Sequence, residues 1–461
     1  MMDKKEYCGV FGVYNHPSAV DLTYLGLYAL QHRGEESCGI AAFNGKKLRQ
    51  FNGMGLVSEG LNKKRLKELK GCTAIGHVRY STTGSSIIKN AQPFAIKHNK
   101  GVIAIAHNGN LVNAVKLRRK MESEGAIFQT TMDSEIVLHL LVRTKEDVFE
   151  KRAADALKKC EGAYTMLFLT EQHLIGVRDP YGFRPLCLGK KDGAYVLASE
   201  TCALDLIDAE FIREVEPGEM IIISESGMRS IKPFDEKTPA PCIFEHIYFS
   251  RPDSHIFGDS VLKVRKRLGI QLAKEHPAKA DLCMSIPDSG NYAALGYSEQ
   301  SGIPFEFGMI RNHYVGRTFI QPSQEMRKHG VKIKLNPVKD VLREKKVVVV
   351  EDSIVRGTTT EGRIKAIRSA GAKEIHMRIS CPPIKYPCFY GIDFPSRKEL
   401  IANQKRSVDA IADFIGVDSL KYLSLEGMIK AAGGGAFCSA CFSGKYPTKI
   451  RKTSIKAPFE K

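Results

Sequence analysis

The stretch VVVVEDSIVRGTTT, residues 347–360, decides the fold of the second half of this chain. Its four consecutive valines predict a strand that is buried on both faces, as in a parallel sheet covered by helices. Glu351 and Asp352 follow at the end of that strand, and Gly357 with three threonines leads into a predicted helix over residues 361–370. Ligands of open α/β sheets bind at the carboxyl ends of strands, where a helix N-terminus offers N–H groups to an anion. The stretch therefore predicts a ligand with a phosphate at one end and a polyol or metal ion nearby.

The segments around this stretch predict the rest of a parallel sheet. Residues 281–304 indicate a strand, a turn and a helix, and residues 374–380 (EIHMRIS) indicate another strand. Strands that alternate with helices form a parallel, doubly wound sheet. The segment 312–338 is long, basic and poor in regular periodicity, and we expect it to act as a lid over the site.

The pattern at 347–360 resembles the signature of type I phosphoribosyltransferases, which displace pyrophosphate from 5-phosphoribosyl 1-pyrophosphate (PRPP). A plain strand–helix turn would explain the threonines but not two acids beside a run of valines. Most members carry two acids here, often Asp-Asp, whereas this chain carries Glu-Asp. The resemblance implies PRPP-binding residues in the turn and in the lid: Glu351, Asp352, Arg356, Gly357, Thr358, Thr359, Tyr314, Arg317 and Lys334. It also implies Mg²⁺, which prefers oxygen ligands, near Ser289, Glu351 and Asp352.

The first half contains several loops in which polar residues lie between glycines and short apolar strands. They are CGVFGVY (8–14), LQHRGEESCGIA (30–41), GHVRYSTTG (76–84), HNGNL (107–111) and TMDSE (131–135). In this order they resemble the glutaminase domain of class II glutamine amidotransferases. These are N-terminal-nucleophile hydrolases, so the resemblance implies a four-layer αββα fold with two stacked antiparallel sheets between helices.

The resemblance implies that Cys8 is the catalytic nucleophile and that its own α-amine is the base. An α-amine titrates at about 7.7–8.0, which suits proton transfer near neutral pH. While residues 1–7 remain, Cys8 has an amide nitrogen, which cannot act as a base. We therefore predict that residues 1–7 are a propeptide that is removed. The alternative is a degenerate domain that is never activated.

The other roles in the glutaminase are carried over by motif. Arg79 is expected to pair with the α-carboxylate of glutamine and Asp133 with its α-ammonium group. Asn108 and Gly109 are expected to supply a side-chain amide and a backbone N–H to the oxyanion, and Arg33 to order the pocket. Three histidines, His32, His77 and His107, lie in separate loops without metal-ligand spacing, and we predict structural roles for them.

Together the two halves resemble the amidophosphoribosyltransferases over nearly the whole chain. The resemblance implies that ammonia released at Cys8 displaces pyrophosphate from PRPP to give 5-phosphoribosylamine, the first step of de novo purine (IMP) synthesis. The predicted organisation is a propeptide (1–7), a glutaminase domain (8–231), a linker rich in proline and charge (232–241), and a phosphoribosyltransferase domain (242–461). Purine nucleotide inhibitors and a tetrameric or dimeric homo-oligomer are implied by the family.

Four of the 12 cysteines form a further candidate site. Cys438 and Cys441 make a C-x₂-C pair, which alone fits zinc or redox chemistry. Cys242 and Cys388 lie in contexts that match the family members with a 4Fe-4S cluster, for which four thiolates are the usual ligands. We expect a structural, oxygen-sensitive cluster, with zinc as the alternative and free core cysteines as the least favoured case. Cys381 competes with Cys388 but lacks the family context.

Composition limits the remaining classes. The net charge is +18, but the lysines are dispersed and no nucleic-acid-binding motif is present, so we expect no nucleic-acid partner. No apolar run is long enough to span a membrane and MMDKKEY is not a secretory signal, so a cytoplasmic location is expected. Two hypotheses compete with a bifunctional enzyme. One is a non-catalytic regulator that keeps the PRPP pocket and binds nucleic acid with its positive surface. The other is another class II amidotransferase, such as the one that makes glucosamine phosphate.

Overall fold

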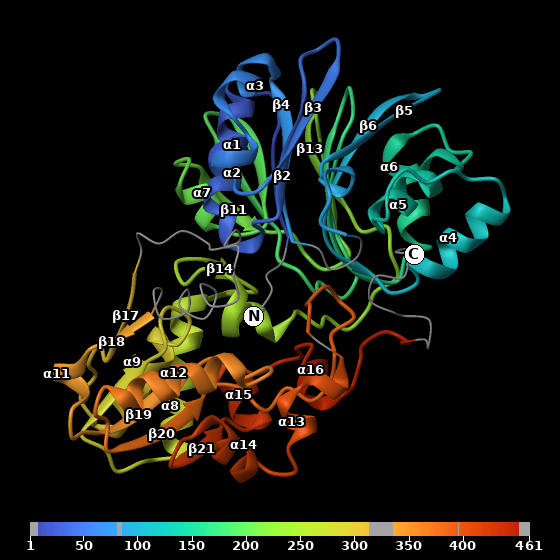
Figure 1. Cartoon of the computed structure of the whole chain (residues 1–461). Coiled ribbons are helices and arrows are strands. Elements are labelled where there is room, and N and C mark those ends of the chain that lie inside the picture. The colour runs from blue at the N-terminus through green and yellow to red at the C-terminus, as the bar shows by residue number, and fades with distance from the viewer. Residues whose placement is uncertain (1–7, 81–84, 313–334, 395, 451–461) are drawn as a thin grey trace.

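The chain forms two halves that pack against each other (Figure 1). The computed structural model describes residues 8–80, 85–312, 335–394 and 396–450. The first half contains two antiparallel sheets between helices, and the second contains a parallel sheet with helices on both faces. The predicted fold classes of both halves are confirmed.

The first antiparallel sheet contains the start of the described chain at its centre. Its strands follow the order β11 (Glu210–Glu214), β9 (Cys187–Lys191), β10 (Ala194–Ala198), β1 (Gly9–Val13), β4 (Thr73–Arg79), β2 (Ser37–Phe43) and β3 (Leu48–Met54). The strand β1 pairs with β10 on one side and β4 on the other. Cys8 immediately precedes β1, so the central strand fixes its backbone.

The second antiparallel sheet carries the HNGNL motif. Its order is β13 (Gly227–Ile231), β12 (Met220–Ser224), β8 (Leu174–Arg178), β7 (Gly162–Leu169), β6 (Gly101–Leu111) and β5 (Phe94–His98). The two sheets share a buried apolar layer that includes Val10, Ile75, Leu167 and Leu197. This layer sets the distance between Cys8 on one sheet and β6 on the other.

Helices cover the outer faces of both sheets. The first sheet packs against α1 (Ala19–Ala29), α2 (Val57–Gly60), α3 (Lys63–Glu68) and α7 (Cys202–Asp205). The second sheet packs against α4 (Ala114–Ser123), α5 (Ser134–Val142) and α6 (Phe149–Leu157). The result is the four-layer arrangement that the sequence predicts.

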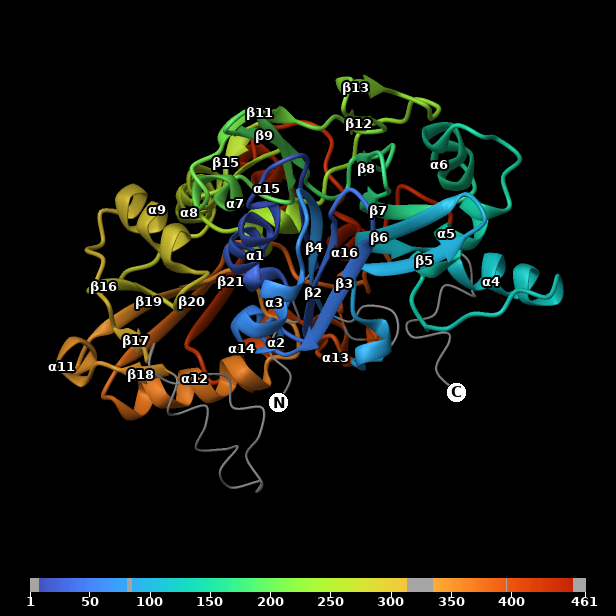
Figure 2. The same ribbon diagram turned by 90° about the horizontal axis from the view of Figure 1, so that it is seen from above.

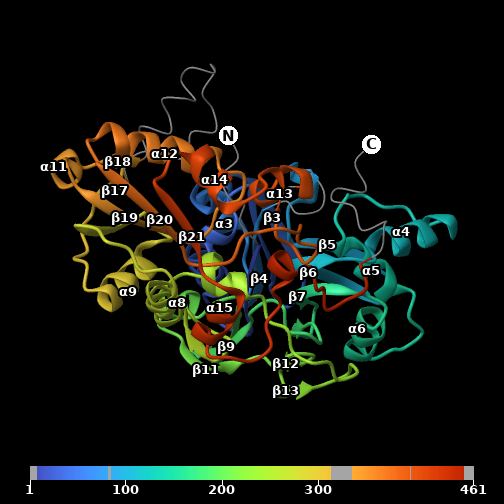
Figure 3. The ribbon, with the colours of Figure 1, turned by 90° about the horizontal axis from the view of Figure 1, so that it is seen from below.

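The second half is built on a parallel sheet in the order β16 (Leu282–Ser285), β19 (Lys346–Glu351), β20 (Glu374–Ile379) and β21 (Ser419–Tyr422). Figures 2 and 3 show α8 (Val261–Glu275) and α9 (Asn291–Ser301) on one face, with α12 (Thr358–Ser369) and α14 (Val408–Ile415) on the other. Covered on both faces, the four valines of β19 are fully buried. This explains why the strand shows no polar alternation.

Smaller elements complete the second half. They are η3 (Glu245–Phe249), β14 (His255–Ile256), β15 (Asp259–Ser260), β17 (Met309–Arg311), β18 (Leu335–Pro337), α11 (Lys339–Leu342), η4 (Arg397–Glu399), α13 (Ile401–Gln404), α15 (Leu425–Ala431) and α16 (Ala440–Ser443). The first half also has the short turns η1 (Gln31–Arg33) and η2 (Ile88–Asn90). No helix formed by the described residues has the length and apolar character needed to cross a membrane.

Two predicted boundaries differ from the structure. The helix expected at 361–370 begins at Thr358, because Gly357 adopts a left-handed conformation and the threonines form the first turn. The lid expected at 312–338 has regular structure at its end, since β18 pairs with β17 and α11 follows. The proposed division at 232–241 is not decided by the fold alone.

Candidate active sites

The Cys8 thiol is buried at the start of β1. Its Sγ donates a weak hydrogen bond to the Tyr80 carbonyl at 3.5 Å, and its own carbonyl accepts from Arg33 Nε at 3.0 Å. Burial raises the pKa of the Cys8 thiol to about 11, although the Tyr80 contact and Arg79 lower it. The thiol is therefore protonated near neutral pH and needs a base to become a nucleophile.

Two opposite charges stand near the thiol, as predicted for a clamp on an amino acid. Arg79 and Asp133 act in opposite directions on the pKa of Cys8, which places both within electrostatic range. Arg79 ends β4, and its guanidinium donates to the Ser85 carbonyl at 3.1 Å. Asp133 precedes α5 and accepts from the Leu111 N–H at 2.8 Å. Such a pair suits the carboxylate and ammonium groups of one amino acid.

Burial alone would raise the pKa of Asp133, but its contact with His107 at 3.3 Å and backbone N–H groups lower it. Asp133 therefore stays ionised, as its predicted role requires. The His107 contact was not predicted. It gives this histidine a supporting function beside the clamp.

Asn108 and Gly109 form a distinctive segment of β6. The Asn108 side chain is completely buried, and neither its oxygen nor its nitrogen has a hydrogen-bond partner among the described residues. Gly109 has φ +151, and a Cβ there would lie 2.0 Å from the Ala163 carbonyl oxygen. Only glycine fits at position 109. The side-chain amide of Asn108, the preceding residue, is left available for a ligand. Both observations fit an oxyanion site.

The other residues predicted near this pocket have protein partners. Arg33 contacts Glu200 at 2.5 Å and Glu245 at 2.8 Å, besides the Cys8 carbonyl. His32 contacts Glu200 at 2.8 Å, and His77 contacts the His107 carbonyl at 2.9 Å. Burial lowers the pKa of His77 to about 3, so this residue is neutral. The structure brings these histidines into hydrogen-bond networks.

The predicted acid pair lies at the carboxyl end of β19, beside the turn after β16. Asp352 is buried and accepts from Ser289 Oγ at 2.7 Å. Glu351 is buried and contacts Arg363 of α12 at 2.6 Å. The structure therefore brings Ser289 and Asp352 together, whereas Glu351 adjoins Asp352 in the chain and pairs with Arg363. The oxygen atoms of Ser289, Glu351 and Asp352 are of the type that Mg²⁺ prefers.

The turn into α12 has the predicted features of a phosphate site. Gly357 has φ +81, and a Cβ there would lie 2.3 Å from Ile401 Cδ1. Thr358 and Thr359 form the first turn of this helix, whose first N–H groups have no acceptor within the helix. Arg356 turns toward Glu399 at 3.0 Å. The predicted lid residues Tyr314, Arg317 and Lys334 lie outside the described residues.

The four predicted cluster cysteines are buried and gather at the junction of the halves. Cys242 and Cys438 form a parallel β-bridge, and the Cys438 N–H donates to the Pro241 carbonyl at 2.8 Å. Burial is the main cause that raises the pKa of Cys441, and Cys242, Cys388 and Cys438 raise it further. Within the described ranges, no group of three or more His, Cys, Asp or Glu residues is arranged to hold a metal ion.

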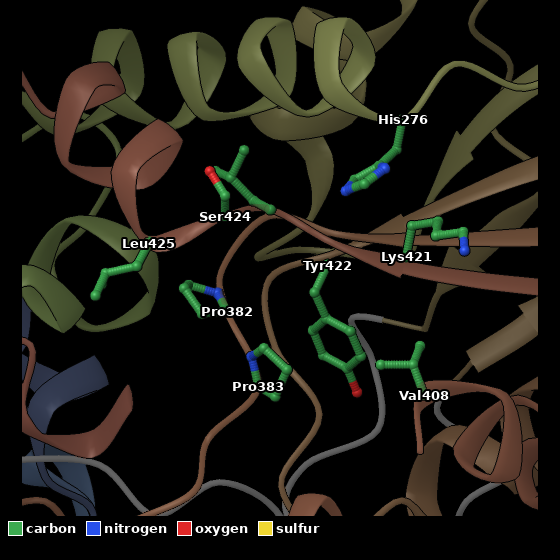
Figure 4. Close-up of a pocket in the computed structure, with 9 residues that line it drawn as sticks. His276, Pro382, Pro383, Val408, Lys421, Tyr422, Ser424 and Leu425 are labelled. Carbon is green, nitrogen blue, oxygen red and sulfur yellow. The ribbon is translucent and has the colours of Figure 1, made fainter. Parts of the chain in front are cut away.

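A cavity of about 330 Å³ lies at the carboxyl end of β21 (Figure 4). Its lining includes Tyr422, Pro382, Pro383 and Lys421, and none of the predicted substrate residues. The Tyr422 hydroxyl is buried, and no hydrogen-bond partner for it lies in the part of the chain that the structure describes. Burial, and then Cys381 and Glu351, raise the pKa of Tyr422, so the cavity lies within electrostatic range of the second candidate site.

Sequence reasoning missed three charged partners, of which Glu200 and Glu245 are buried and Arg363 is partly exposed. Arg363 holds Glu351 from α12, and Glu200 and Glu245 hold Arg33. The only signal for the two glutamates was an isolated acid in an apolar context, as in CIFEH. Such a signal does not name the partner, because the contacts join segments that are far apart in sequence.

Comparison with known proteins identifies relatives of both halves. Residues 77–206 match the family described as glutamine amidotransferase domain. The chain is 52% identical over 456 residues to amidophosphoribosyltransferase 1, chloroplastic, of Arabidopsis thaliana, covering 98% of this chain and 80% of that protein. It is 49% identical to the amidophosphoribosyltransferase of Methanocaldococcus jannaschii, covering 97% of this chain and 99% of that protein.

Two solved structures agree over nearly the whole chain. One is described as the allosteric regulatory enzyme of purine biosynthesis, with a TM-score of 0.94, 48% identity and 98% of each chain covered. The other is glutamine PRPP amidotransferase from B. subtilis complexed with ADP and GMP, with a TM-score of 0.93 and 47% identity, covering 98% of this chain and 100% of that one. The chain thus belongs to the amidophosphoribosyltransferases, a family of glutamine-dependent glycosyltransferases.

Proposed function

We propose that this enzyme hydrolyses glutamine at Cys8 and uses the ammonia to displace pyrophosphate from PRPP, giving 5-phosphoribosylamine for purine synthesis. The observation that carries the proposal is the completely buried Asn108 amide, which lacks a hydrogen-bond partner among the described residues. An unsatisfied buried amide costs free energy unless a ligand completes it. Beside Arg79, Asp133 and the Cys8 thiol, an oxyanion formed from glutamine is the ligand that fits best.

The base for Cys8 is its own α-amine, made free by removal of residues 1–7. The high pKa of the buried thiol supports this assignment, because the proton must be taken by a group beside the sulfur. Arg79 and Asp133 orient the substrate, and Asn108 with the Gly109 N–H stabilises the oxyanion. The proton taken from the thiol is then available to the departing ammonia.

At the second site, the first turn of α12 binds the 5-phosphate of PRPP, with Gly357, Thr358 and Thr359 supplying backbone N–H and hydroxyl groups. Ser289, Glu351 and Asp352 supply oxygens to the ribose hydroxyls and to Mg²⁺. When bound, Mg²⁺ neutralises negative charge that grows on the leaving pyrophosphate. Arg356 turns from Glu399 to the substrate. Tyr314, Arg317 and Lys334, which lie outside the described residues, are assigned to PRPP binding from the family resemblance.

Cys242, Cys388, Cys438 and Cys441 hold a structural 4Fe-4S cluster. Burial, and then the neighbouring cysteines, raise the pKa of Cys438 and Cys441, so these thiols are costly to ionise without a nearby cation and a bound cluster suits their chemistry. The cluster would join the C-terminal segment to the start of the second half.

The division into a glutaminase domain (8–231), a linker (232–241) and a phosphoribosyltransferase domain (242–461) is part of the proposal. The apolar core around the parallel sheet supports it, because that core takes in Ile243, Phe244 and Ile247 directly after the linker. Purine nucleotides regulate the enzyme, which is a homo-oligomer. The relative solved with ADP and GMP supports nucleotide binding.

The test is pyrophosphate release by anaerobically purified enzyme that lacks residues 1–7. Glutamine, PRPP and Mg²⁺ together should give steady release, and omitting any one should stop it. Cys8→Ala should lose activity with glutamine and keep activity with ammonium salts. No release from the unmodified processed enzyme with either nitrogen source would refute the proposed function.

A further inference from the structure

A buried network of charges connects the nucleophile to the second half of the chain. Arg33 donates through Nε to the Cys8 carbonyl at 3.0 Å, and its two terminal nitrogens contact Glu245 at 2.8 Å and 3.0 Å. Arg33 and Glu245 are almost completely buried. Glu245 lies in η3, after the proposed linker. A residue of the second half therefore fixes the Arg33 side chain, and Arg33 in turn binds the Cys8 carbonyl.

The Glu245 carboxylate is fixed from several sides. Arg184 contacts it at 3.1 Å, and Ser250 Oγ donates to it at 2.9 Å. Arg184 also donates to the Tyr390 carbonyl at 2.6 Å. Burial alone would raise the pKa of Glu245, but Arg33 and Arg184 lower it, so the carboxylate is ionised. Its position is therefore set by both halves.

A second contact reaches the other side of the same pocket. Asn110 Nδ2 donates to the Phe389 carbonyl at 2.9 Å, two residues after Asn108 on β6. A Cβ on Gly391 would lie 3.3 Å from the carbonyl carbon of Gly109. The backbone of the second half therefore packs directly against the oxyanion segment.

We infer that Glu245 is a positioning residue for glutamine hydrolysis, acting through Arg33 on the backbone of Cys8. Each donor group of the Arg33 side chain is directed at a fixed acceptor, and Glu245 supplies two of these contacts. Without the Glu245 carboxylate, the guanidinium keeps its contact with Glu200 through one terminal nitrogen but loses the acceptor of the other, so its donation to the Cys8 carbonyl is held less firmly. The sulfur and the α-amine are attached to the same residue, so their approach to the substrate becomes less exact.

The inference rests on the proposed function and makes a selective prediction. Glu245→Gln keeps the shape of the side chain but removes its charge. We expect kcat with glutamine to fall about tenfold to a hundredfold, with KM for glutamine changing by less than about twofold because Arg79 and Asp133 are untouched. Activity with ammonium salts should stay close to that of the unmodified enzyme, since nothing in the PRPP site changes.

The experiment compares processed enzyme, Glu245→Gln, Ser250→Ala and the control Glu299→Gln with each nitrogen source. Glu299 is also in the second half but forms an exposed ion pair with Lys266. Ser250→Ala removes one hydrogen bond to Glu245 and should give a smaller fall in kcat with glutamine. This milder variant keeps the test possible if Glu245→Gln does not fold. Covalent labelling of Cys8 by an electrophilic glutamine analogue should slow in parallel with kcat.

Equal losses with glutamine and with ammonium salts would overturn the inference, because they indicate general damage. Unchanged kcat with glutamine in both Glu245→Gln and Ser250→Ala would also overturn it. Failure of the proposed function would look different, since the unmodified processed enzyme would then release no pyrophosphate with either nitrogen source.

Discussion

Cys8 is a thiol that cannot ionise by itself near neutral pH. Its pKa is raised to about 11 by burial, although Arg79 lies close enough to lower it. A free α-amine beside the sulfur resolves this conflict, because it accepts the proton within the same residue. Under the proposed function, Cys8 therefore needs a free α-amine before it can act as the nucleophile.

The first prediction concerns the pH dependence of glutamine hydrolysis. The α-amine must be neutral to act as a base, so kcat/KM for glutamine should rise as pH increases through about 7.7–8.0. Initial rates between neutral and alkaline pH test this, with N-terminal mass spectrometry on the same sample. A fully active sample that still carries residues 1–7 would contradict the assignment.

The second prediction concerns Asn108. Asn108→Ala removes the amide that we assign to the oxyanion, so kcat with glutamine should fall about a hundredfold to a thousandfold. KM should change little, because Arg79 and Asp133 hold the substrate at its other end. The matched control is Asn52→Ala on the other sheet, whose amide donates to the Ala91 and Pro93 carbonyls away from Cys8. A rise in KM for glutamine with kcat unchanged would contradict the assigned role of Asn108.

At this scale the sequence predicted the site residues and the pairing of Ser289 with Asp352, but not the buried charged partners. Cys8, Arg79 and Asp133 stand in motifs, and the structure groups them. Ser289 and Asp352 are 63 positions apart, and they are in contact as expected. The partners Glu245 and His107 were missed, because a buried ion pair depends on tertiary packing and leaves no periodic pattern in the sequence.

At the scale of elements, two glycines shape the sites. Gly109 leaves a position without a side chain on β6, next to Asn108, and Gly357 makes the left-handed turn that begins α12. At Gly109 a side chain is excluded both by the positive φ and by the Ala163 backbone carbonyl, whereas at Gly357 the positive φ is the main obstacle, since its close neighbour is the flexible end of Ile401. Both glycines lie at positions that we assign to ligand binding.

The third prediction compares two glycines of this helix region. Gly357→Ala should raise KM for PRPP and destabilise the turn, because its Cβ would meet Ile401 and φ is +81. Gly362→Ala is the control, since nothing lies within 4 Å of that Cβ position. It should stabilise the helix by about 1 kcal/mol. Equal PRPP affinity in the two variants would contradict the phosphate role of the turn.

The type of each main element was predictable, whereas some boundaries were not. The run of valines predicted β19 correctly, because burial on both faces removes polar residues from a strand. The start of α12 was placed three residues too late, since threonine favours turns as well as first helical turns. The residues of the predicted lid between 313 and 334 lie outside the described residues, so that prediction stands untested.

At the scale of the whole molecule, the two halves meet through buried polar contacts. Glu245 and the proposed cluster ligand Cys242 are only three residues apart, and Phe389 follows Cys388 directly. The cysteine segments therefore lie next to the contacts that reach Cys8 and β6. Loss of the cluster should affect the junction before it affects either sheet.

The fourth prediction tests the cluster itself. Anaerobically purified enzyme should contain iron and acid-labile sulfide, and Cys441→Ser should lose both. Cys160→Ser is the control, because that cysteine is remote from the four and donates to the Ala156 carbonyl of α6. Zinc without sulfide in the unmodified enzyme would contradict the cluster and favour the zinc alternative.

The last prediction concerns the stability of the junction in acid. Burial alone would raise the pKa of Glu200, but His32 and Arg33 lower it well below its usual range. A carboxylate with a lowered folded pKa stabilises the native state above its unfolded pKa, about 4.3 for glutamate, and this stabilisation is lost as pH falls further. The free energy of unfolding should therefore decrease below about pH 4.3.

Glu200→Gln should flatten this decrease, because the group no longer titrates. At neutral pH the same substitution should destabilise the enzyme by about 3–5 kcal/mol, since the Arg33 charge then lacks one of its buried partners. Thermal unfolding of both proteins from neutral to acidic pH measures the two effects. Glu299→Gln, which changes only an exposed pair, should follow the unmodified curve. If the stability of Glu200→Gln falls with pH in parallel with that of the unmodified enzyme, the loss of stability in acid does not come from Glu200.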